Sequence, residues 1–563
     1  MPLLLLLFVA LACGHAPPQT TRKGAAPLPA APIAASDAAR TAAELSEETH
    51  ALLRAEGELL WTRWTTGTGP LPSSALAEHP RLAKRESIEA VSTAAASARG
   101  ADAPALRLLA QQLATLALSR EARAGIEALE IARAQLAFAV PGETRATVGE
   151  RDLDRLLMEE PGAQKRGALA AAEAKAAAPL APLAISRDEA VEKAVAALGL
   201  GSWTALQENA LRMPLPQLAD LAERTLAATA DVGGRAVAAA SVRNLGTTSD
   251  RLRRADLPRL VRTALADAQF SPGKAWPVAR DVFNHIGAAP PPRLHVDAEP
   301  SPSKGARPLA LLVDPPIDVR ISLRPSGGFE EQRGTFHEGS RAVGATIAAV
   351  PRWELAQLGD GSAAEGAAQL FEALAGDPEW LRGATQLRGE PLDDLVHTEA
   401  TRRLLTARRA AALVLFELRR REGARTAEAQ AALYRGLIQR ALFCAVSEDD
   451  AARWALEADP MLRAATTLLG SVLAAQLEQK LGPSWWNAQQ PTLHKIWEGG
   501  RSLTALEAAR ALGMAQLDPA ALAALADRRL QYAAPDAPPD TPKPDYSYMQ
   551  GDKKKRRKKA KKK

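Results

Sequence analysis

The chain has 563 residues, of which 47% are hydrophobic, 24% are charged and only 4% are aromatic. This apolar fraction is enough for a sizeable core and excludes a chain that is disordered throughout. No uninterrupted apolar run reaches the ~20 residues that a membrane-spanning helix needs, which argues against a polytopic membrane protein. The two cysteines, Cys13 and Cys444, exclude a disulfide framework and a cysteine-based zinc finger.

The formal net charge of +6 is misleading, because residues 552–563 alone hold ten Lys or Arg and one Asp, a balance of +9. The rest of the chain therefore carries a net charge of −3. Overall charge gives no sign that the folded part binds nucleic acid, and we expect no specific nucleic-acid partner.

The N-terminus begins with an apolar run of ten residues, 3–12, a length typical of a signal peptide and too short for a stable membrane span. Cys13 follows Ala-Leu-Ala, which resembles a bacterial lipoprotein cleavage site, where the cysteine becomes the lipidated first residue. We interpret 1–13 as a signal peptide of this type and the Pro- and Ala-rich residues 14–36 as a tether. Lipidated Cys13 would hold the exported protein on a membrane of the bacterial cell envelope, on the periplasmic or outer-membrane face. An ordinary secretory signal is the alternative.

Helical periodicity predicts a mainly α-helical fold. Residues 37–190 form a first helical region, in which 164–180 is expected to be an exposed helix rich in Ala, Glu and Lys. The pattern continues, between Gly and Pro clusters, through 187–230, 251–268, 364–375, 396–422, 426–443, 450–480 and 503–530. Only 309–314 and 319–324 are typical of strands, and the PPID sequence between them predicts a β-hairpin. A helix over 329–350 is expected directly after the hairpin.

The one chemical signature is the pair His337-Glu338 within this helix. Glu365 lies 28 residues after His337, at the start of another expected helix. This spacing is similar to that of zinc peptidases in which an HExxH helix supplies two histidines and a later helix supplies a glutamate.

The likeness extends beyond the motif. Residues 194–285, the segment 295–328 with its RPSGG end, the AEG helix around Glu365 and the segment 481–500 together resemble the thimet oligopeptidase/oligoendopeptidase F superfamily of zinc metallopeptidases. The resemblance covers about residues 190–530, so we assign 191–531 to a metallopeptidase-like domain. It implies a large helical body with a central channel, a small hairpin beside the HExxH-type helix, and a zinc site on the channel floor that cuts peptides.

Within this resemblance, His337 and Glu365 take the positions of the first and third metal ligands, and Glu338 takes that of the general base. Arg341 stands where the second histidine is expected. A guanidinium has no lone pair to donate, and at ~5 Å its repulsion of Zn²⁺ is roughly 7 kcal/mol, a large part of typical zinc-binding energies of about 10–16 kcal/mol. We therefore expect no metal cofactor, and expect Arg341 to form a bidentate ion pair with Glu365 in place of the ion. A weak zinc site completed by water is the alternative.

A second departure concerns the tyrosine that stabilises the oxyanion in this superfamily. The aligned segment 464–477 contains no tyrosine, and Thr466-Thr467 occupy its place. The histidines at 285, 295, 397 and 494 are interpreted as ordinary packed or surface residues, and Trp485-Trp486 as packing. Gly327-Gly328 are interpreted either as a turn or as part of an edge along which a peptide adds as a strand.

The leading hypothesis is an exported metallopeptidase-like protein without zinc, a pseudopeptidase that binds peptides or a protein partner. One alternative is an active zinc oligopeptidase with an atypical ligand set. Another is an envelope scaffold, whose Pro- and Lys-rich tail, 532–563, binds an anionic surface through residues 553–563. The sequence leaves the oligomeric state open.

Overall fold

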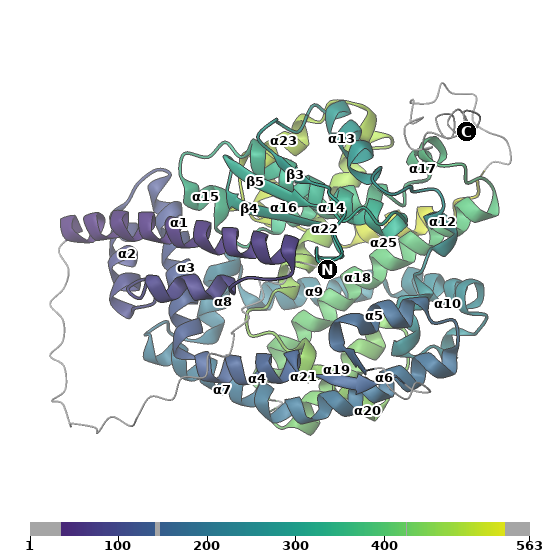
Figure 1. Cartoon of the computed structure of the whole chain (residues 1–563), viewed down its shortest axis with the longest axis horizontal. Helices are drawn as coiled ribbons and strands as arrows, with labels where there is room; N and C mark the ends of the chain where they lie inside the picture. Colours follow the sequence, from purple (N-terminus) through teal and green to yellow (C-terminus); the bar gives the residue numbers. More distant parts are fainter. Residues whose placement is uncertain (1–34, 141–146, 424, 535–563) are drawn as a thin grey trace, which may run out of the picture.

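The computed structural model describes residues 35–140, 147–423 and 425–534 (Figure 1). The expected lipidation site Cys13, most of the expected tether and the Lys-rich tail lie outside the described residues. Within them the protein is mainly α-helical with two small sheets, which confirms the expected fold class.

The N-terminal helices form one end of the molecule. The long helix α1 packs on α2, which packs on α3, and α1 also contacts strand β4 of the central sheet (Figure 1). The elements of this end are α1 (Ala35–Thr66), the 3₁₀ helix η1 (Pro72–Glu78), α2 (Arg85–Ser97) and α3 (Asp102–Glu121). The apolar face of α1 is the reason for this packing, since Ala38, Ala42, Leu45 and Leu52 are all buried at helical spacing.

The next helices form the lower half of the molecule in Figure 1. They are α4 (Arg123–Ala134), α5 (Glu150–Glu159), α6 (Ala163–Ala177), η2 (Ala178–Leu180), α7 (Ala181–Ala197), α8 (Trp203–Leu211), α9 (Leu215–Ala228), α10 (Ala230–Leu245), η3 (Ser249–Arg251), η4 (Arg254–Asp256), α11 (Leu257–Leu260) and α12 (Ala264–Asp267). The prediction that 164–180 is exposed was wrong: α6 buries Leu169, Ala170, Ala174 and the charged Glu173. Its buried charges are matched by residues from distant segments, Glu173 by Arg453 and Arg166 by Asp256, which local periodicity cannot detect.

Helix α7 runs through residue 190, where the sequence suggested a boundary, and buried residues from both sides belong to one continuous core that reaches from Ala38 to Leu517. By length and composition, one described helical stretch, Ala163–Ala197, is apolar enough to cross a membrane, yet 44% of its most apolar window is buried inside the protein.

The predicted hairpin is present as β4 (Leu309–Asp314) and β5 (Asp318–Ser322), paired antiparallel with Leu309 opposite Ser322. A third strand, β3 (His295–Asp297), pairs in parallel with β5, giving the strand order β3-β5-β4. A separate small antiparallel sheet joins β1 (Ala137–Ala139) to β2 (Thr147–Gly149). The sequence analysis missed β1, β2 and β3 because each has only three residues.

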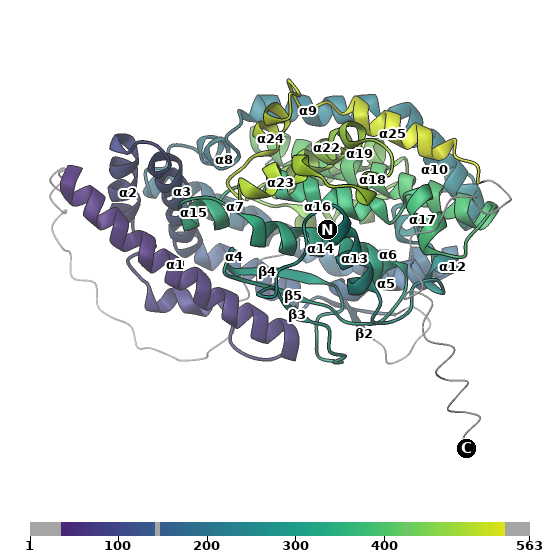
Figure 2. The same cartoon turned by 90° about the horizontal axis from the view of Figure 1, so that it is seen from above.

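Most of the remaining helices pack around the sheet in the upper half of Figure 1, whereas α19, α20 and α21 lie in the lower half; Figure 2 shows α14 and α16 above the strands. They are α13 (Ala275–His285), α14 (Phe329–Ile347), α15 (Trp353–Gln357), α16 (Ser362–Leu374), α17 (Pro378–Ala384), α18 (Glu390–Glu422), α19 (Ala427–Leu442), α20 (Glu448–Ala451), α21 (Trp454–Glu457), α22 (Ala464–Leu481), η5 (Trp485–Asn487), α23 (Pro491–Glu498), α24 (Ala505–Ala511) and α25 (Ala520–Leu530). Helix α16 contacts both α14 and α22, so the two predicted site helices lie side by side in the middle of this half.

Candidate functional site

Gly328 and Asp267 of α12 fix the start of α14, the helix that carries the His-Glu pair. Gly328 precedes the helix with φ of +92°, a conformation that favours glycine, and the Phe329 backbone N–H donates to Asp267 Oδ1 at 3.0 Å. On the same side, strand β4 reaches the site directly, since the Ala310 N–H donates to Glu338 Oε2 at 2.9 Å. The glycine pair is therefore a turn that aims α14 along the sheet.

Helix α22 closes the opposite side of the site. A Cβ on Gly470 would lie only 2.7 Å from Glu365 Cγ, so the absence of a side chain at 470 is what lets α22 approach Glu365 of α16. This close approach seals the site: the exposed fractions of His337, Glu338 and Glu365 are 6%, 5% and 6%. The resemblance implies an open channel above these residues. Since the three side chains are buried, the channel stays a prediction.

The structure brings the three predicted residues into contact. His337 Nδ1 lies 3.0 Å from Glu338 Oε1, and His337 Nε2 lies 3.4 Å from Glu365 Oε1. Both ring nitrogens thus face a carboxylate. We call His337, Glu338, Arg341 and Glu365 the His337 cluster.

Two further residues of α16 belong to this site and were missed by the sequence analysis. Gln369 Nε2 donates to Glu365 Oε1 at 2.9 Å, and its Oε1 accepts a hydrogen bond of 2.6 Å from Ser471 of α22. Glu372 Oε2 lies 3.9 Å from His337 Nε2. Helical spacing could have found both, because positions i+4 and i+7 from Glu365 share its face of the helix.

Arg341 differs from the prediction. Its Nη1 lies 3.7 Å from Glu338 Oε1, and among the described residues it forms no ion pair with Glu365. The reason is geometric: Arg341 and Glu338 are three residues apart on one helix and so are surface neighbours, whereas Glu365 is already engaged by His337 and Gln369.

Arg501 is a second guanidinium near this site that sequence reasoning could not place. It packs against the backbone of Gly361, at the N-terminus of α16. Within the described part of the chain its side chain makes no hydrogen bond or ion pair. Burial, with the neighbouring Arg341 charge, lowers the pKa of Arg501 to about 10.

The charges of the His337 cluster stabilise one another. Burial alone would lower the pKa of His337, but the adjacent Glu365 and Glu338 carboxylates outweigh it and raise the pKa to about 10. Burial would raise the pKa of both glutamates, yet His337 and Arg341 hold the pKa of Glu365 and of Glu338 below the usual range. The two carboxylates therefore favour the protonated form of the imidazole that lies between them.

This donor set does not fit a zinc ion in the arrangement of the superfamily. A zinc-binding histidine offers a neutral nitrogen lone pair to the ion, whereas both ring nitrogens of His337 lie beside carboxylates. The position of the second histidine holds a guanidinium, which is not a ligand. Across residues 35–140, 147–423 and 425–534, no group of three or more His, Cys, Asp or Glu side chains is arranged to hold a metal.

The other predicted residues lie as follows. The Thr466–Thr467 segment does border the site, because the Thr467 carbonyl accepts a hydrogen bond of 3.2 Å from Gln369 Nε2. The remaining histidines make contacts elsewhere: His285 with the Asp281 carbonyl, His295 with Trp61, His397 with the Tyr532 carbonyl and His494 with Trp497. Trp485 and Trp486 are buried and contact each other, and Trp485 also packs on Phe371.

Comparison with known proteins adds no relative: no family model matches the chain, and no curated protein is similar to it. Fold and site together define a mainly helical protein with a buried histidine–carboxylate cluster between a β-hairpin and three packed helices.

Proposed function

We propose that the protein is a metallopeptidase-like pseudoenzyme, in which a zinc site of the HExxH type has been replaced by an internal set of ion pairs. The observation that carries this proposal is the contact pattern of His337. Its two ring nitrogens lie 3.0 Å from Glu338 and 3.4 Å from Glu365, the residues expected to act as base and as metal ligand. A base whose carboxylate is engaged by an imidazolium and by Ala310 is poorly placed to take a proton from water.

Arg341 supports the same proposal from the electrostatic side. A site with two buried carboxylates and no divalent cation carries negative charge. Burying this charge costs free energy unless positive groups compensate it. Arg341 and protonated His337 supply that compensation. The role that fits is binding of a peptide or protein partner without hydrolysis.

Metal analysis of purified protein tests the proposal. We expect wild type to hold much less than one zinc per chain after dialysis, and Arg341→His to hold about one, because an imidazole at this position shares a helix face with His337. Arg341→Gln is the matched control: it removes the positive charge without adding a ligand and should stay without zinc.

The proposal is wrong if wild type holds one tightly bound zinc and cleaves peptides in a chelator-sensitive reaction. That result would favour the active oligopeptidase instead. Failure of Arg341→His to take up zinc would show that the loss of the metal does not depend on this residue alone.

For location, we propose export and lipid anchoring through Cys13, with residues 553–563 contacting an anionic surface; both rest on the sequence alone. Mass spectrometry of the N-terminal peptide from membrane fractions tests the anchor. A peptide that begins upstream of Cys13, or an unmodified Cys13, would contradict it.

A further inference from the structure

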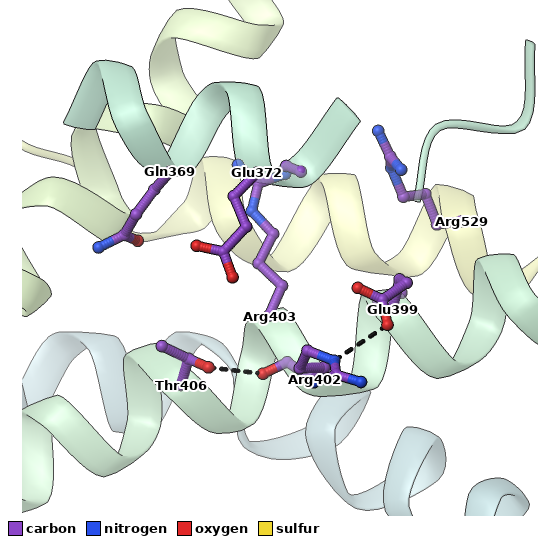
Figure 3. Close-up of a pocket in the computed structure, with 9 residues that line it drawn as sticks. Gln369, Glu372, Glu399, Arg402, Arg403, Thr406 and Arg529 are labelled. Atoms are coloured by element: carbon purple, nitrogen blue, oxygen red, sulfur yellow. Dashed lines mark hydrogen bonds and ion pairs between the residues drawn. The ribbon is translucent and has the colours of Figure 1, made fainter. Parts of the chain in front are cut away.

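Next to the His337 cluster lies a small pocket between α16, α18 and α25, with a cavity volume of about 40 Å³, that is partly open to solvent. Its charged wall is formed by Glu372 from α16, by Glu399, Arg402 and Arg403 from α18, and by Arg529 from α25 (Figure 3). Nothing in the metallopeptidase resemblance assigns a role to this pocket.

Two of the three arginines are already satisfied by protein carboxylates. Arg402 pairs with Glu330 at 2.8 Å and with Glu399 at 2.9 Å. Arg529 pairs with Glu478 at 2.8 Å. These two guanidiniums hold the walls of the pocket in place.

Arg403 is different, because only one side of its guanidinium is used. Its Nη1 pairs with Glu478, while its Nη2 is buried and has no hydrogen-bond partner in the part of the chain that the structure describes. A buried N–H without an acceptor costs about 1–3 kcal/mol, so such groups are usually paired with protein, water or a ligand. Arg403 Nη2 is thus a buried donor beside the pocket, without an acceptor among the described residues.

The acceptors in the pocket are the second oxygens of two glutamates. Glu372 gives one oxygen to Arg333, and its Oε2 lies 3.9 Å from His337 Nε2, beyond hydrogen-bond distance. Glu399 Oε2 accepts no hydrogen bond from any described residue, since the only bond to this carboxylate ends on Oε1. Figure 3 shows Glu372 pointing from α16, and Arg403 from α18, into the same space between the two helices.

This combination selects against ligands with a single charge. A simple anion would meet Arg403 but also the Glu372 and Glu399 carboxylates, and a simple cation would meet three guanidiniums. A small molecule that carries both charges a few ångströms apart matches both sides. We propose that the pocket binds a small zwitterion, namely a free α-amino acid, with its carboxylate on Arg403 and its ammonium group on Glu372 and Glu399.

The proposal does not rest on the absence of zinc. It would survive a wild-type protein that holds the metal, and the metal-free proposal would survive a pocket that binds nothing. The metal analysis and the test of amino-acid binding can therefore contradict one proposal without contradicting the other.

Screening the full-length protein against the twenty L-amino acids, by thermal unfolding and then by calorimetric titration, tests the inference. At least one amino acid should raise the unfolding midpoint by about 2–3 °C at a concentration of ~100 Kd. Its methyl ester and its N-acetyl derivative, each of which lacks one of the two charges, should bind at least about tenfold more weakly.

Variants locate the binding. Arg403→Met and Glu372→Gln should each weaken binding about tenfold or more. Ala373→Leu keeps every charge but adds bulk to the pocket wall, and should also weaken it, which covers the case that a charge variant fails to fold. Arg419→Met is the matched control, since Arg419 lies further along α18 and pairs at the surface with Glu223.

The inference is overturned if no amino acid binds wild type, if the ester or the N-acetyl derivative binds as well as the parent, or if inorganic phosphate competes at equal concentration. Unchanged binding in Ala373→Leu, or an equal loss in Arg419→Met, would also overturn it.

Discussion

Among the described residues, the His337 cluster can be compared with another buried ion cluster, which lies on no recognisable motif. The second, which we call the Glu173 cluster, lies in the lower half of Figure 1 between α6, η4, α18, α20 and α21. Its members are Glu173, Arg254, Arg409, Asp450, Arg453 and Glu457.

In the Glu173 cluster the carboxylates have direct guanidinium partners. Arg453 contacts Glu173 and Glu457, and Arg254 lies 2.7 Å from Asp450. The partners come from segments far apart in the chain, so the cluster joins helices. These contacts define a structural cluster.

In the His337 cluster the charges are less completely matched. The nearest guanidinium, Arg341, is 3.7 Å from Glu338, and the carboxylates share one histidine instead of each having an arginine. The comparison teaches that burial of charge alone does not mark a functional site. Incomplete pairing beside a motif is the more informative sign.

The largest effect should come from breaking the Glu173 cluster. Arg453→Met removes the closest partner of buried Glu173 and one of the two arginines paired with Glu457, so the free energy of unfolding should fall by about 3–5 kcal/mol. Denaturant unfolding measures this loss. Arg419→Met, which breaks an exposed pair, is the control and should change stability by less than about 1 kcal/mol. If Arg453→Met lowers the free energy of unfolding no more than the control does, the Glu173 cluster is not the structural cluster described above.

A somewhat smaller effect should appear in acid. Burial alone would raise the pKa of Glu457, but Arg409 and Arg453 lower it to about 2. Because the unfolded value is about 4.3, the ionised carboxylate stabilises the fold fully above that pH, and this stability is lost as pH falls towards 2, by up to about 3 kcal/mol. The free energy of unfolding of Glu457→Gln should therefore be lower than that of wild type at neutral pH, and it should change less between pH 4.3 and 2. An equal pH dependence of this free energy in wild type and variant would contradict the prediction.

The smallest effect is expected at Arg341. Its ion pair is long and its side chain is 17% exposed, while Glu338 keeps His337 and the Ala310 N–H as partners. Arg341→Met should therefore cost only about 1 kcal/mol of unfolding free energy in the same assay. A loss equal to that of Arg453→Met would show that Arg341 is a structural residue and would weaken the comparison.

Much of the fold could be predicted because helices and hairpins leave a local pattern. The hairpin formed by Leu309–Asp314 and Asp318–Ser322 was found from its β-prone runs and the turn between them, and α14 begins at the expected Phe329. Three-residue strands carry too little pattern to be found. The burial of α6 was missed because its partner Arg453 is 280 residues away from Glu173.

The site was predictable only in part. His337, Glu338 and Glu365 meet as the motif spacing indicated, since two turns of one helix and the start of another can be placed from sequence. The partner of Arg341 was wrong, because a guanidinium can reach several carboxylates and only the packed structure decides which are already engaged.

By itself the sequence determined the helical class, the hairpin and the residues at the motif, because backbone preference and periodicity act over a few neighbouring positions. Only the tertiary structure decided that Gly470 admits α22 to Glu365, that Arg501 lies beside the cluster, and that Arg403 has a buried donor without an acceptor among the described residues, beside a pocket between three helices. These contacts join residues from different helices, and their energies depend on burial and on competing partners, which a linear pattern does not encode.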